Sequence, residues 1–166
     1  MLLAAWFMLA ACSPSLNWRQ VEGTDAPFVV LLPAKPSTLS RPIDLDGRQV
    51  TMSMTATEVD GVTFAVGVIV LPDAALAPKA LQAMKLALVR NINGSIESEQ
   101  ATNTSSSFDI VAIGNVGRSQ ESVRLLAHFA ARDQRVYQAV MIGPGRAISA
   151  MGADTADTFF TSFKLH

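Results

Sequence analysis

The sequence predicts an α+β fold in which helices flank an antiparallel sheet, in the manner of an α/β/α sandwich. Segments that alternate between apolar and polar residues, the pattern of half-buried strands, recur between residues 28 and 142. Apolar residues change to helical spacing twice, once in the middle of the chain and once near its end. Short turns join neighbouring strands, which favours antiparallel pairing.

The first elements are extended. Residues 18–22 form a short lead-in, and the apolar run at residues 28–32 is typical of a buried strand that stops at Pro33. Residues 33–42 contain three prolines. We expect them to form a loop that merges into an edge strand.

A hairpin should follow, built from residues 48–57 and 62–70. The Asp-Gly pair between them favours a two-residue turn, but that register would place the two apolar faces on opposite sides of the sheet. We therefore expect a three-residue loop over residues 59–61, with its glycine at positive φ and Val66 opposite Met54.

The rest of the chain alternates between helix and strand. A helix of about fifteen residues should begin near Pro78 and end at Asn93-Gly94, where the glycine takes the left-handed cap. The remaining expected elements are a marginal strand at 96–102, a strand at 108–114, a hairpin of 123–132 with 135–142 around a turn of two or four residues, and a helix at 147–160.

The N-terminus carries the most specific motif. Leu2 to Ala11 is an apolar run that suits a secretory signal and is too short to span a bilayer. It ends in Leu9-Ala10-Ala11-Cys12, which holds the chain's one cysteine. This motif resembles that of bacterial lipoproteins, and the resemblance implies cleavage before Cys12 and attachment of diacylglyceryl and fatty acyl groups such as palmitate to that residue.

The same resemblance predicts the location and the domain boundaries. Residues 1–11 would be a signal peptide, residues 12–17 a lipidated tether and residues 18–166 a single α+β domain. Because Ser13 replaces the Asp that retains such proteins in the inner membrane, we expect the periplasmic face of the outer membrane of a Gram-negative bacterium. No Lys or Arg precedes the apolar run, so we expect the true start codon to lie upstream of Met1.

The composition excludes several classes of function. With 13 basic and 14 acidic residues, the chain has no bias towards nucleic acid. The two histidines have no acid or second histidine at ligand spacing, which argues against a metal site, and no cofactor motif is present. No nucleophile motif occurs, so we expect a protein that is not an enzyme.

One set of side chains could bind an anionic group. It lies on the polar face of the second predicted hairpin and consists of Arg124, His128, Arg132 and Tyr137. The simpler interpretation, which we favour, is that these residues solvate the open face of a sheet.

The order of elements resembles the PsbP-like fold. The residues that carry this resemblance are the strand ending in Pro33, the hairpin around Gly61 and the closing Phe-Phe-x-Ser-Phe-x-Leu pattern of residues 159–165. The resemblance implies the α/β/α sandwich but no particular chemistry, because one fold hosts many functions.

Two functional hypotheses follow. The first is a non-catalytic, lipid-anchored binding or accessory module of the cell envelope, with the membrane and an envelope protein as its partners. The second is a carrier of a small apolar or lipidic ligand held between helix and sheet. A carrier needs a cavity lined by Val, Met and Phe, whereas an accessory module should have a filled core and an exposed apolar patch.

Overall fold

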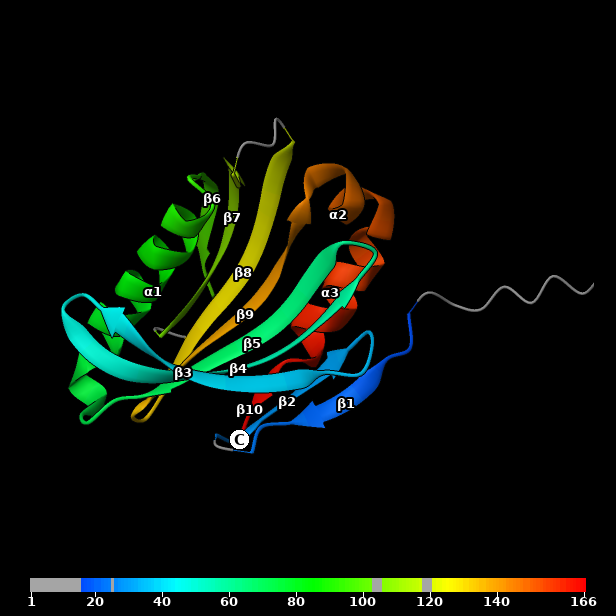
Figure 1. Ribbon diagram of the computed structural model, residues 1–166. Coiled ribbons are helices and arrows are strands. Elements are labelled where there is room, and N and C mark those ends of the chain that lie inside the picture. The colour runs from blue at the N-terminus through cyan, green and yellow to red at the C-terminus, as the bar shows by residue number, and fades with distance from the viewer. Residues whose placement is uncertain (1–15, 25, 103–105, 118–120) are drawn as a thin grey trace, which may run out of the picture.

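The protein folds around a large antiparallel sheet. The computed structural model describes residues 16–24, 26–102, 106–117 and 121–166. The strands of this seven-stranded sheet lie in the order β3-β4-β5-β9-β8-β7-β6 (Figure 1). Their bounds are β3 Ser37–Leu45, β4 Arg48–Val59, β5 Val62–Val70, β6 Ser95–Ala101, β7 Ser107–Asn115, β8 Ser122–Arg132 and β9 Arg135–Pro144.

Both faces of the large sheet are buried at its central strands. Helix α1 (Ala77–Asn91), preceded by the short helix η1 (Ala74–Leu76), packs on one face. Helix α3 (Ala153–Ser162) and a small sheet pack on the other, with α2 (Gly145–Met151) beside them (Figure 1). The residues of the central strands β5, β8 and β9 therefore divide between two apolar cores according to their parity.

The small sheet overturns the predicted architecture. It has three strands in the order β1-β2-β10, with bounds Arg19–Glu22, Phe28–Leu32 and Lys164–Leu165. Strands account for 54% of the described residues and helices for 24%, so the protein is mostly β and the predicted α/β/α sandwich is wrong. The physical reason is that the first and last strands of the described chain pair with β2 instead of joining the large sheet, and so cover a face that we had assigned to a helix.

Contacts between aromatic rings and one serine fix the small sheet against α3. Phe28 and Phe163 lie in contact, with their ring centroids 6.1 Å apart. Ser162 Oγ accepts a hydrogen bond from the backbone N–H of Leu31 at 2.8 Å and donates one to the carbonyl of Phe159 at 2.7 Å. These bonds join the end of α3 to β2.

The predicted three-residue loop in the β4–β5 hairpin is also wrong. Val59 pairs with Val62, which leaves Asp60 and Gly61 as a two-residue turn, both at positive φ (50° and 78°). The positive φ of Gly61 is as predicted. The expectation failed because it assumed one buried face, whereas a sheet buried on both faces accepts apolar residues on either side.

The β8–β9 hairpin agrees with its prediction. Arg132 pairs with Arg135 around the two-residue turn, and Leu125 lies opposite Ile142. Helix α1 begins and ends near its expected position, whereas the helix expected at residues 147–160 is two shorter helices. Asn93, not Gly94, takes the left-handed conformation after α1, and Gly152, at a φ of 79°, divides the predicted final helix into α2 and α3.

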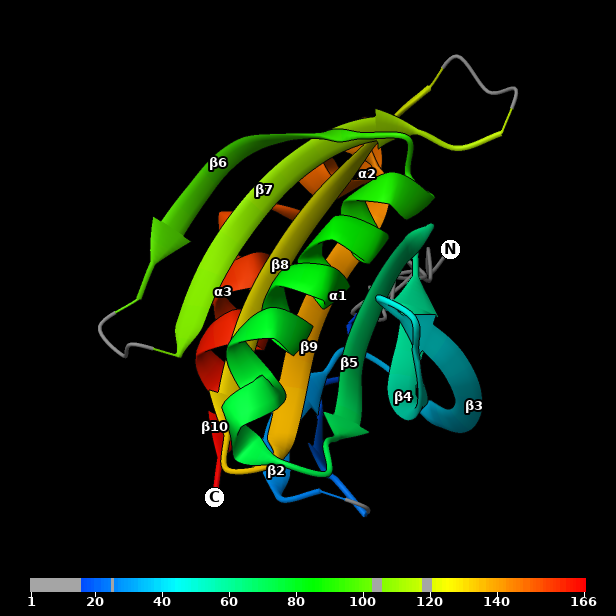
Figure 2. The same ribbon diagram turned by 90° about the vertical axis from the view of Figure 1, so that its left-hand side faces the viewer.

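Strands β3 and β4 curl out of the plane of the sheet towards α1. Figure 2 shows α1 in front of β8 and β9, with β5 and then the β3–β4 pair to its side. Space between the curled pair and the helix forms the candidate site described below. None of the described helices is long and apolar enough to cross a membrane.

Candidate functional site

The predicted lipid attachment residue, Cys12, lies outside the described residues, as do the signal peptide and the first part of the predicted tether. The four residues of the predicted anion-binding face are all described. Arg124, His128 and Arg132 come from β8, and Tyr137 comes from the neighbouring strand β9.

Each basic residue of that face has its own partner within the chain. Arg124 Nη1 lies 3.7 Å from Glu97 Oε2 on β6. His128 Nδ1 lies 2.6 Å from Asp109 Oδ1 on β7. Arg132 donates a hydrogen bond of 3.0 Å from Nη1 to the carbonyl of Leu165 in the small sheet.

Tyr137 differs from the other three because it is buried. Only 1% of its surface is exposed, and its ring contacts Phe28 and Phe163, with centroids 6.4 and 6.2 Å away. Burial raises the pKa of the Tyr137 hydroxyl, although the positive charges of Arg135 and Arg132 oppose this shift. The small sheet covers this part of the face, so Tyr137 is a core residue.

Arg135 is a member of this region that the sequence analysis missed. It lies opposite Arg132 in the β8–β9 register, and its Nε is buried without a hydrogen-bond partner among the described residues. Its position two residues before Tyr137 on one strand could have placed it on the same face.

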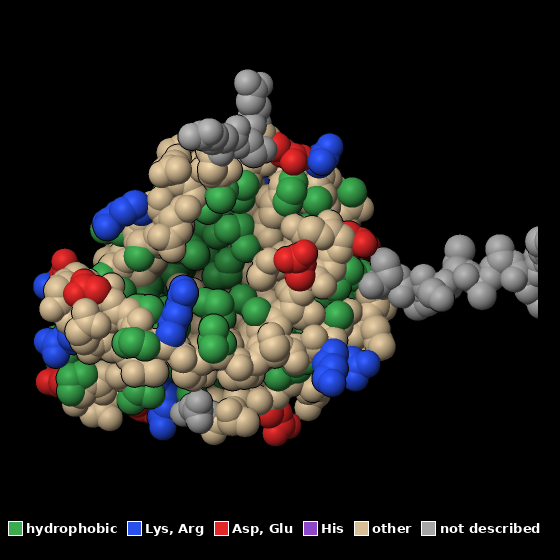
Figure 3. Space-filling model, in the orientation of Figure 1, with side chains coloured by type: hydrophobic (Ala, Val, Ile, Leu, Met, Phe, Trp, Pro, Cys, Tyr) green, Lys and Arg blue, Asp and Glu red, His purple; other side chains and the backbone are tan. Residues whose placement is uncertain are grey.

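A different site lies on the opposite face, between α1 and the β3–β4 pair. Here two hollows of about 220 and 260 Å³ share Arg41, Met52 and Met54 in their walls, and we call the combined space the methionine groove. Figure 3 shows hydrophobic side chains gathered in a hollow on this side of the molecule. Its principal lining residues are Arg41, Met52, Met54, Met84, Leu88 and Gln138.

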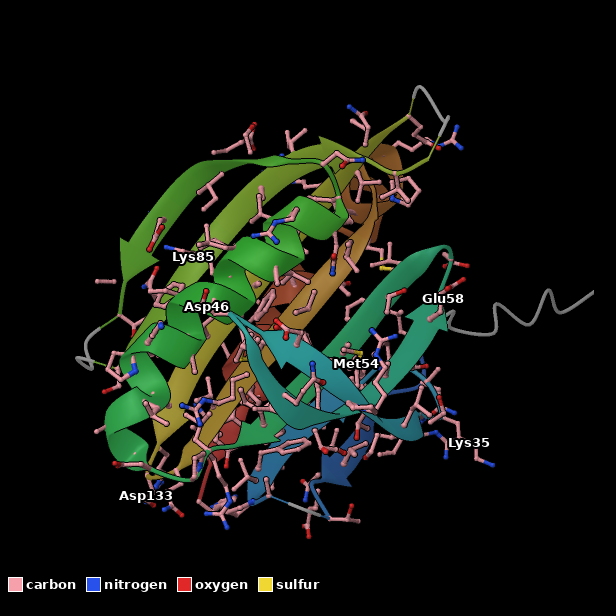
Figure 4. All side chains as sticks on the ribbon, turned by 60° about the vertical axis from the view of Figure 1, so that its left-hand side comes forward. Lys35, Asp46, Met54, Glu58, Lys85 and Asp133 are labelled. Carbon is pink, nitrogen blue, oxygen red and sulfur yellow. The ribbon has the colours of Figure 1, made fainter. Side chains whose placement is uncertain are left out.

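The strand register explains why these side chains meet. Residues directly opposite one another in antiparallel strands share a face. One such row crosses the sheet through Leu39, Met54, Gly67, Gln138 and Phe129. Figure 4 labels Met54 on β4, on the side of the pair that lies towards α1. Met54 belongs to this row because the two-residue turn at Asp60-Gly61 sets the register that pairs it with Gly67.

Gln138 has the one polar side chain in this row of paired residues. The residue as a whole is 5% exposed and lines the groove, and its side-chain amide makes no hydrogen bond with any described residue. Its amide atoms are not among the fully buried atoms without a partner, so they border the open space of the groove. Its neighbour Gly67 leaves room for it, because a Cβ atom at position 67 would lie 3.0 Å from Gln138 Cγ and 3.1 Å from Nε2. Sequence reasoning missed Gln138 because its parity placed it among core residues.

Two charged residues line the groove. Asp44 already accepts hydrogen bonds from the backbone N–H of Gly47 at 2.9 Å and from Gln49 Nε2 at 3.2 Å. Arg41 makes no hydrogen bond or ion pair with a described residue. Because both donors to Asp44 are neutral, its carboxylate keeps its negative charge, and the two charged residues leave the wall of this hollow without a net charge.

Larger hollows elsewhere offer less shelter for an apolar ligand. One of about 450 Å³ beside the start of α1 is lined by Asp46 and Lys79, whose side chains form an ion pair of 2.9 Å at 58% and 76% exposure. Another of about 480 Å³ lies over the other face of β4, next to the exposed Val70. Neither contains a buried polar side chain without a partner among the described residues, so we consider the methionine groove the stronger candidate.

Comparison with known proteins adds no functional assignment. No protein-family model matches the chain, and no curated protein is significantly similar to it. The resemblances to bacterial lipoproteins and to PsbP-like proteins therefore stay predictions. Within the described part of the chain, no group of three or more His, Cys, Asp or Glu side chains is placed to hold a metal ion.

Proposed function

We propose that this protein is a non-catalytic binding module, anchored to the membrane through Cys12, that holds a small apolar or lipidic ligand in the methionine groove. The observation that carries the proposal is the groove itself, an open and largely apolar hollow between a helix and a sheet. Lipid attachment at Cys12 would keep the module at the periplasmic face of the outer membrane, where lipidic ligands are abundant.

The composition of the walls supports such a ligand. Three methionines, Met52, Met54 and Met84, line the hollow. Methionine side chains are flexible and polarizable, so they adapt to apolar groups of differing shape. Binding pockets in proteins combine a mostly apolar lining with a few polar groups, as Gln138 and Arg41 provide here.

An envelope protein partner is the second candidate. It is favoured by Leu39, which is 66% exposed and lines the outer part of the groove. A protein segment that covered Leu39 would bury more apolar surface than a ligand confined to the inner hollow.

A fluorescence titration tests the proposal. The neutral reporter N-phenyl-1-naphthylamine, whose emission rises in an apolar site, is added to the purified full chain carrying Cys12→Ser, which cannot be acylated. We expect saturable binding by this chain. Ala87→Trp places a large ring in the groove and should abolish the saturable signal.

The matched control is Leu86→Trp, which places the same ring at the adjacent, 54% exposed position of α1. It should bind the reporter as the parent chain does. Equal signals from the two tryptophan variants, or no saturable signal from the parent, would show that the groove does not take an apolar ligand. In the second case, crosslinking in native membranes from a photoreactive group at Leu39 would test the protein partner.

A further inference from the structure

The charged residues that line the methionine groove balance one another. Among the described residues that line its two hollows, only Arg41 and Asp44 carry a charge, and both are exposed residues of β3. Asp44 accepts hydrogen bonds from neutral donors of Gly47 and Gln49, so its carboxylate stays charged. An anionic or cationic group that entered the groove would lose hydration without meeting an excess of opposite charge. The walls therefore favour a neutral ligand.

Gln138 places a neutral polar group on the floor of this groove. Its amide makes no hydrogen bond with a described residue, and its polar atoms border the open space, so they are accessible to a ligand. The methionines beside it, Met52, Met54 and Met84, offer only weakly accepting sulfur atoms. The amide both donates and accepts hydrogen bonds. A hydroxyl group does the same and can therefore bond to either end of the amide.

Gly67 leaves space for this amide. A Cβ atom at position 67 would lie 3.0 Å from Gln138 Cγ, 3.1 Å from Nε2 and 3.3 Å from Cδ, so alanine would displace the amide. The backbone of Gly67 is not at positive φ, so the conformation of β5 does not require a glycine there. Glycine inside a strand lowers stability and often marks a place where another group approaches closely. Here that group is the side chain of Gln138.

We propose that the ligand is a neutral single-chain amphiphile with a hydroxyl head group, of the fatty alcohol or monoacylglycerol class. Its hydroxyl group would bond to the amide of Gln138, and its aliphatic tail would lie on Met52, Met54 and Met84. The two hollows, of about 220 and 260 Å³, together fall in the lower part of the size range of ligand pockets, which favours one aliphatic chain over two. This inference rests on the proposed function, since it names the ligand of the same groove.

Displacement of the naphthylamine reporter tests the charge of the ligand. Decanol, decanoate and decylammonium are compared on the full chain carrying Cys12→Ser, at about pH 8, where both charged probes are ionised. We expect decanol to bind most tightly and the two charged probes to bind about equally. Arg41→Gln should favour decylammonium over decanoate by about threefold, and Asp44→Asn should do the reverse, as for exposed charges. Arg19→Gln, the same change at an exposed residue of β1, should leave the ratio unchanged.

A ratio of two neutral probes tests the hydroxyl group. Any apolar surface prefers decanol to charged probes, so decanol is also compared with decanethiol, whose S–H group is a weak donor. Gln138→Leu should lower the preference for decanol over decanethiol about fivefold, the value expected for one neutral hydrogen bond. Because the ratio is taken within each variant, a change in the shape of the groove affects both probes. Met54→Leu, an apolar exchange of similar volume in the same groove, should leave the ratio unchanged, whereas Gly67→Ala should lower it.

The outcomes distinguish the two proposals. If the reporter binds in the groove but a charged probe displaces it better than decanol, or Gln138→Leu leaves the ratio of decanol to decanethiol unchanged, the ligand class is wrong and the proposed function stands. If the reporter itself does not bind, both proposals fail. Reporter binding, a preference for decanol, opposite shifts in Arg41→Gln and Asp44→Asn, and a ratio lowered by Gln138→Leu but not by Met54→Leu would together support the inference.

Discussion

Lys85 provides a sharp test of the energetics of the α1 core. Its side chain is 10% exposed, and Nζ lies 2.9 Å from each carboxylate oxygen of Glu99 on the edge strand β6. The same ammonium group lies 5.2 Å from the centroid of the Phe108 ring. Figure 4 shows Lys85 on α1, on the side that lies towards β6. The buried cation is thus held by one carboxylate and one aromatic ring.

Removing the carboxylate should cost more than removing the cation. In Glu99→Ala, Lys85 keeps its charge in a buried position without its partner. Such a loss costs about 3–5 kcal/mol for a fully buried pair and about 0–1 kcal/mol for an exposed one. Because the Glu99 side chain is 39% exposed, water can replace part of the lost interaction. We therefore expect a decrease of about 2 kcal/mol in the free energy of unfolding.

Lys85→Met removes the charge and keeps an unbranched apolar chain against Phe108. We expect a change within about 1 kcal/mol, since replacing a buried ion by an apolar group of similar volume is often close to neutral. The double variant should resemble Lys85→Met alone. Urea unfolding followed by circular dichroism measures these values, and a loss of 2 kcal/mol lowers the midpoint by about 1 M at a typical slope.

The result that would refute this reasoning is a reversed order. If Lys85→Met destabilises the protein as much as Glu99→Ala, then packing of the long side chain, and not the uncompensated charge, dominates the interaction. If Glu99→Ala costs less than about 0.5 kcal/mol, the pair behaves as an exposed surface pair. High salt provides a further check, because it screens an exposed pair more than a buried one.

Four further predictions concern other parts of the chain. Tyr137 should make the protein less stable in alkali. Because the pKa of Tyr137 is raised in the folded state, its contribution to the free energy of unfolding is complete below the unfolded pKa of about 10 and is lost as the pH rises through the folded pKa. Unfolding of Tyr137→Phe measured as a function of pH should lack this alkaline loss of stability. Gly61→Ala should cost about 1 kcal/mol in thermal or urea unfolding, because alanine is strained at a φ of 78°; an unchanged midpoint would argue against a positive φ at this position. Gln138→Leu should change the unfolding free energy by less than about 1 kcal/mol, because the amide makes no hydrogen bond with a described residue and its polar atoms are not fully buried; a loss of about 2 kcal/mol would reveal a partner for the amide. Cys12→Ser should release the protein from membranes or leave it uncleaved, and unchanged processing and membrane retention would refute the lipid anchor.

The strand pattern was informative about single elements. The run at Phe28–Leu32, the hairpin at Asp133-Gln134 and the helix that begins near Pro78 all depend on interactions within a few residues of one another. Alternation and turn residues report such local preferences directly. These elements could therefore be predicted before the fold was known.

The site was harder to predict because it depends on how the elements are placed. The alternation predicted that Arg124, His128, Arg132 and Tyr137 share one face of the second hairpin. The register of β8 and β9 does place them on one face. The alternation could not show that the small sheet would cover Tyr137 or that Glu97 and Asp109 would engage two of the basic residues. A sheet face that alternation predicts to be exposed can be covered by a distant segment, as Phe28 covers Tyr137 here.

Gln138 is a residue of the groove that the sequence alone could not identify. Its place on β9 follows from alternation, but its lack of a hydrogen bond depends on Gly67 in β5 and on the curl of β3 and β4. Only the combination of these strands with α1 leaves a hollow above the amide. No local pattern distinguishes this glutamine from one that is satisfied in a core.

The sequence by itself determined where most of the strands and the helix α1 lie, the hairpin turn at Asp133-Gln134 and the signal-like motif that ends at Cys12, because each depends on neighbouring residues. The tertiary structure decided that both faces of the large sheet are buried, that the turn at Gly61 has two residues, and that Met54 and Gln138 share a groove. The physical reason is that strand pairing and burial depend on long-range contacts, and the free energy of burying a second face can reverse a register that local patterning favours.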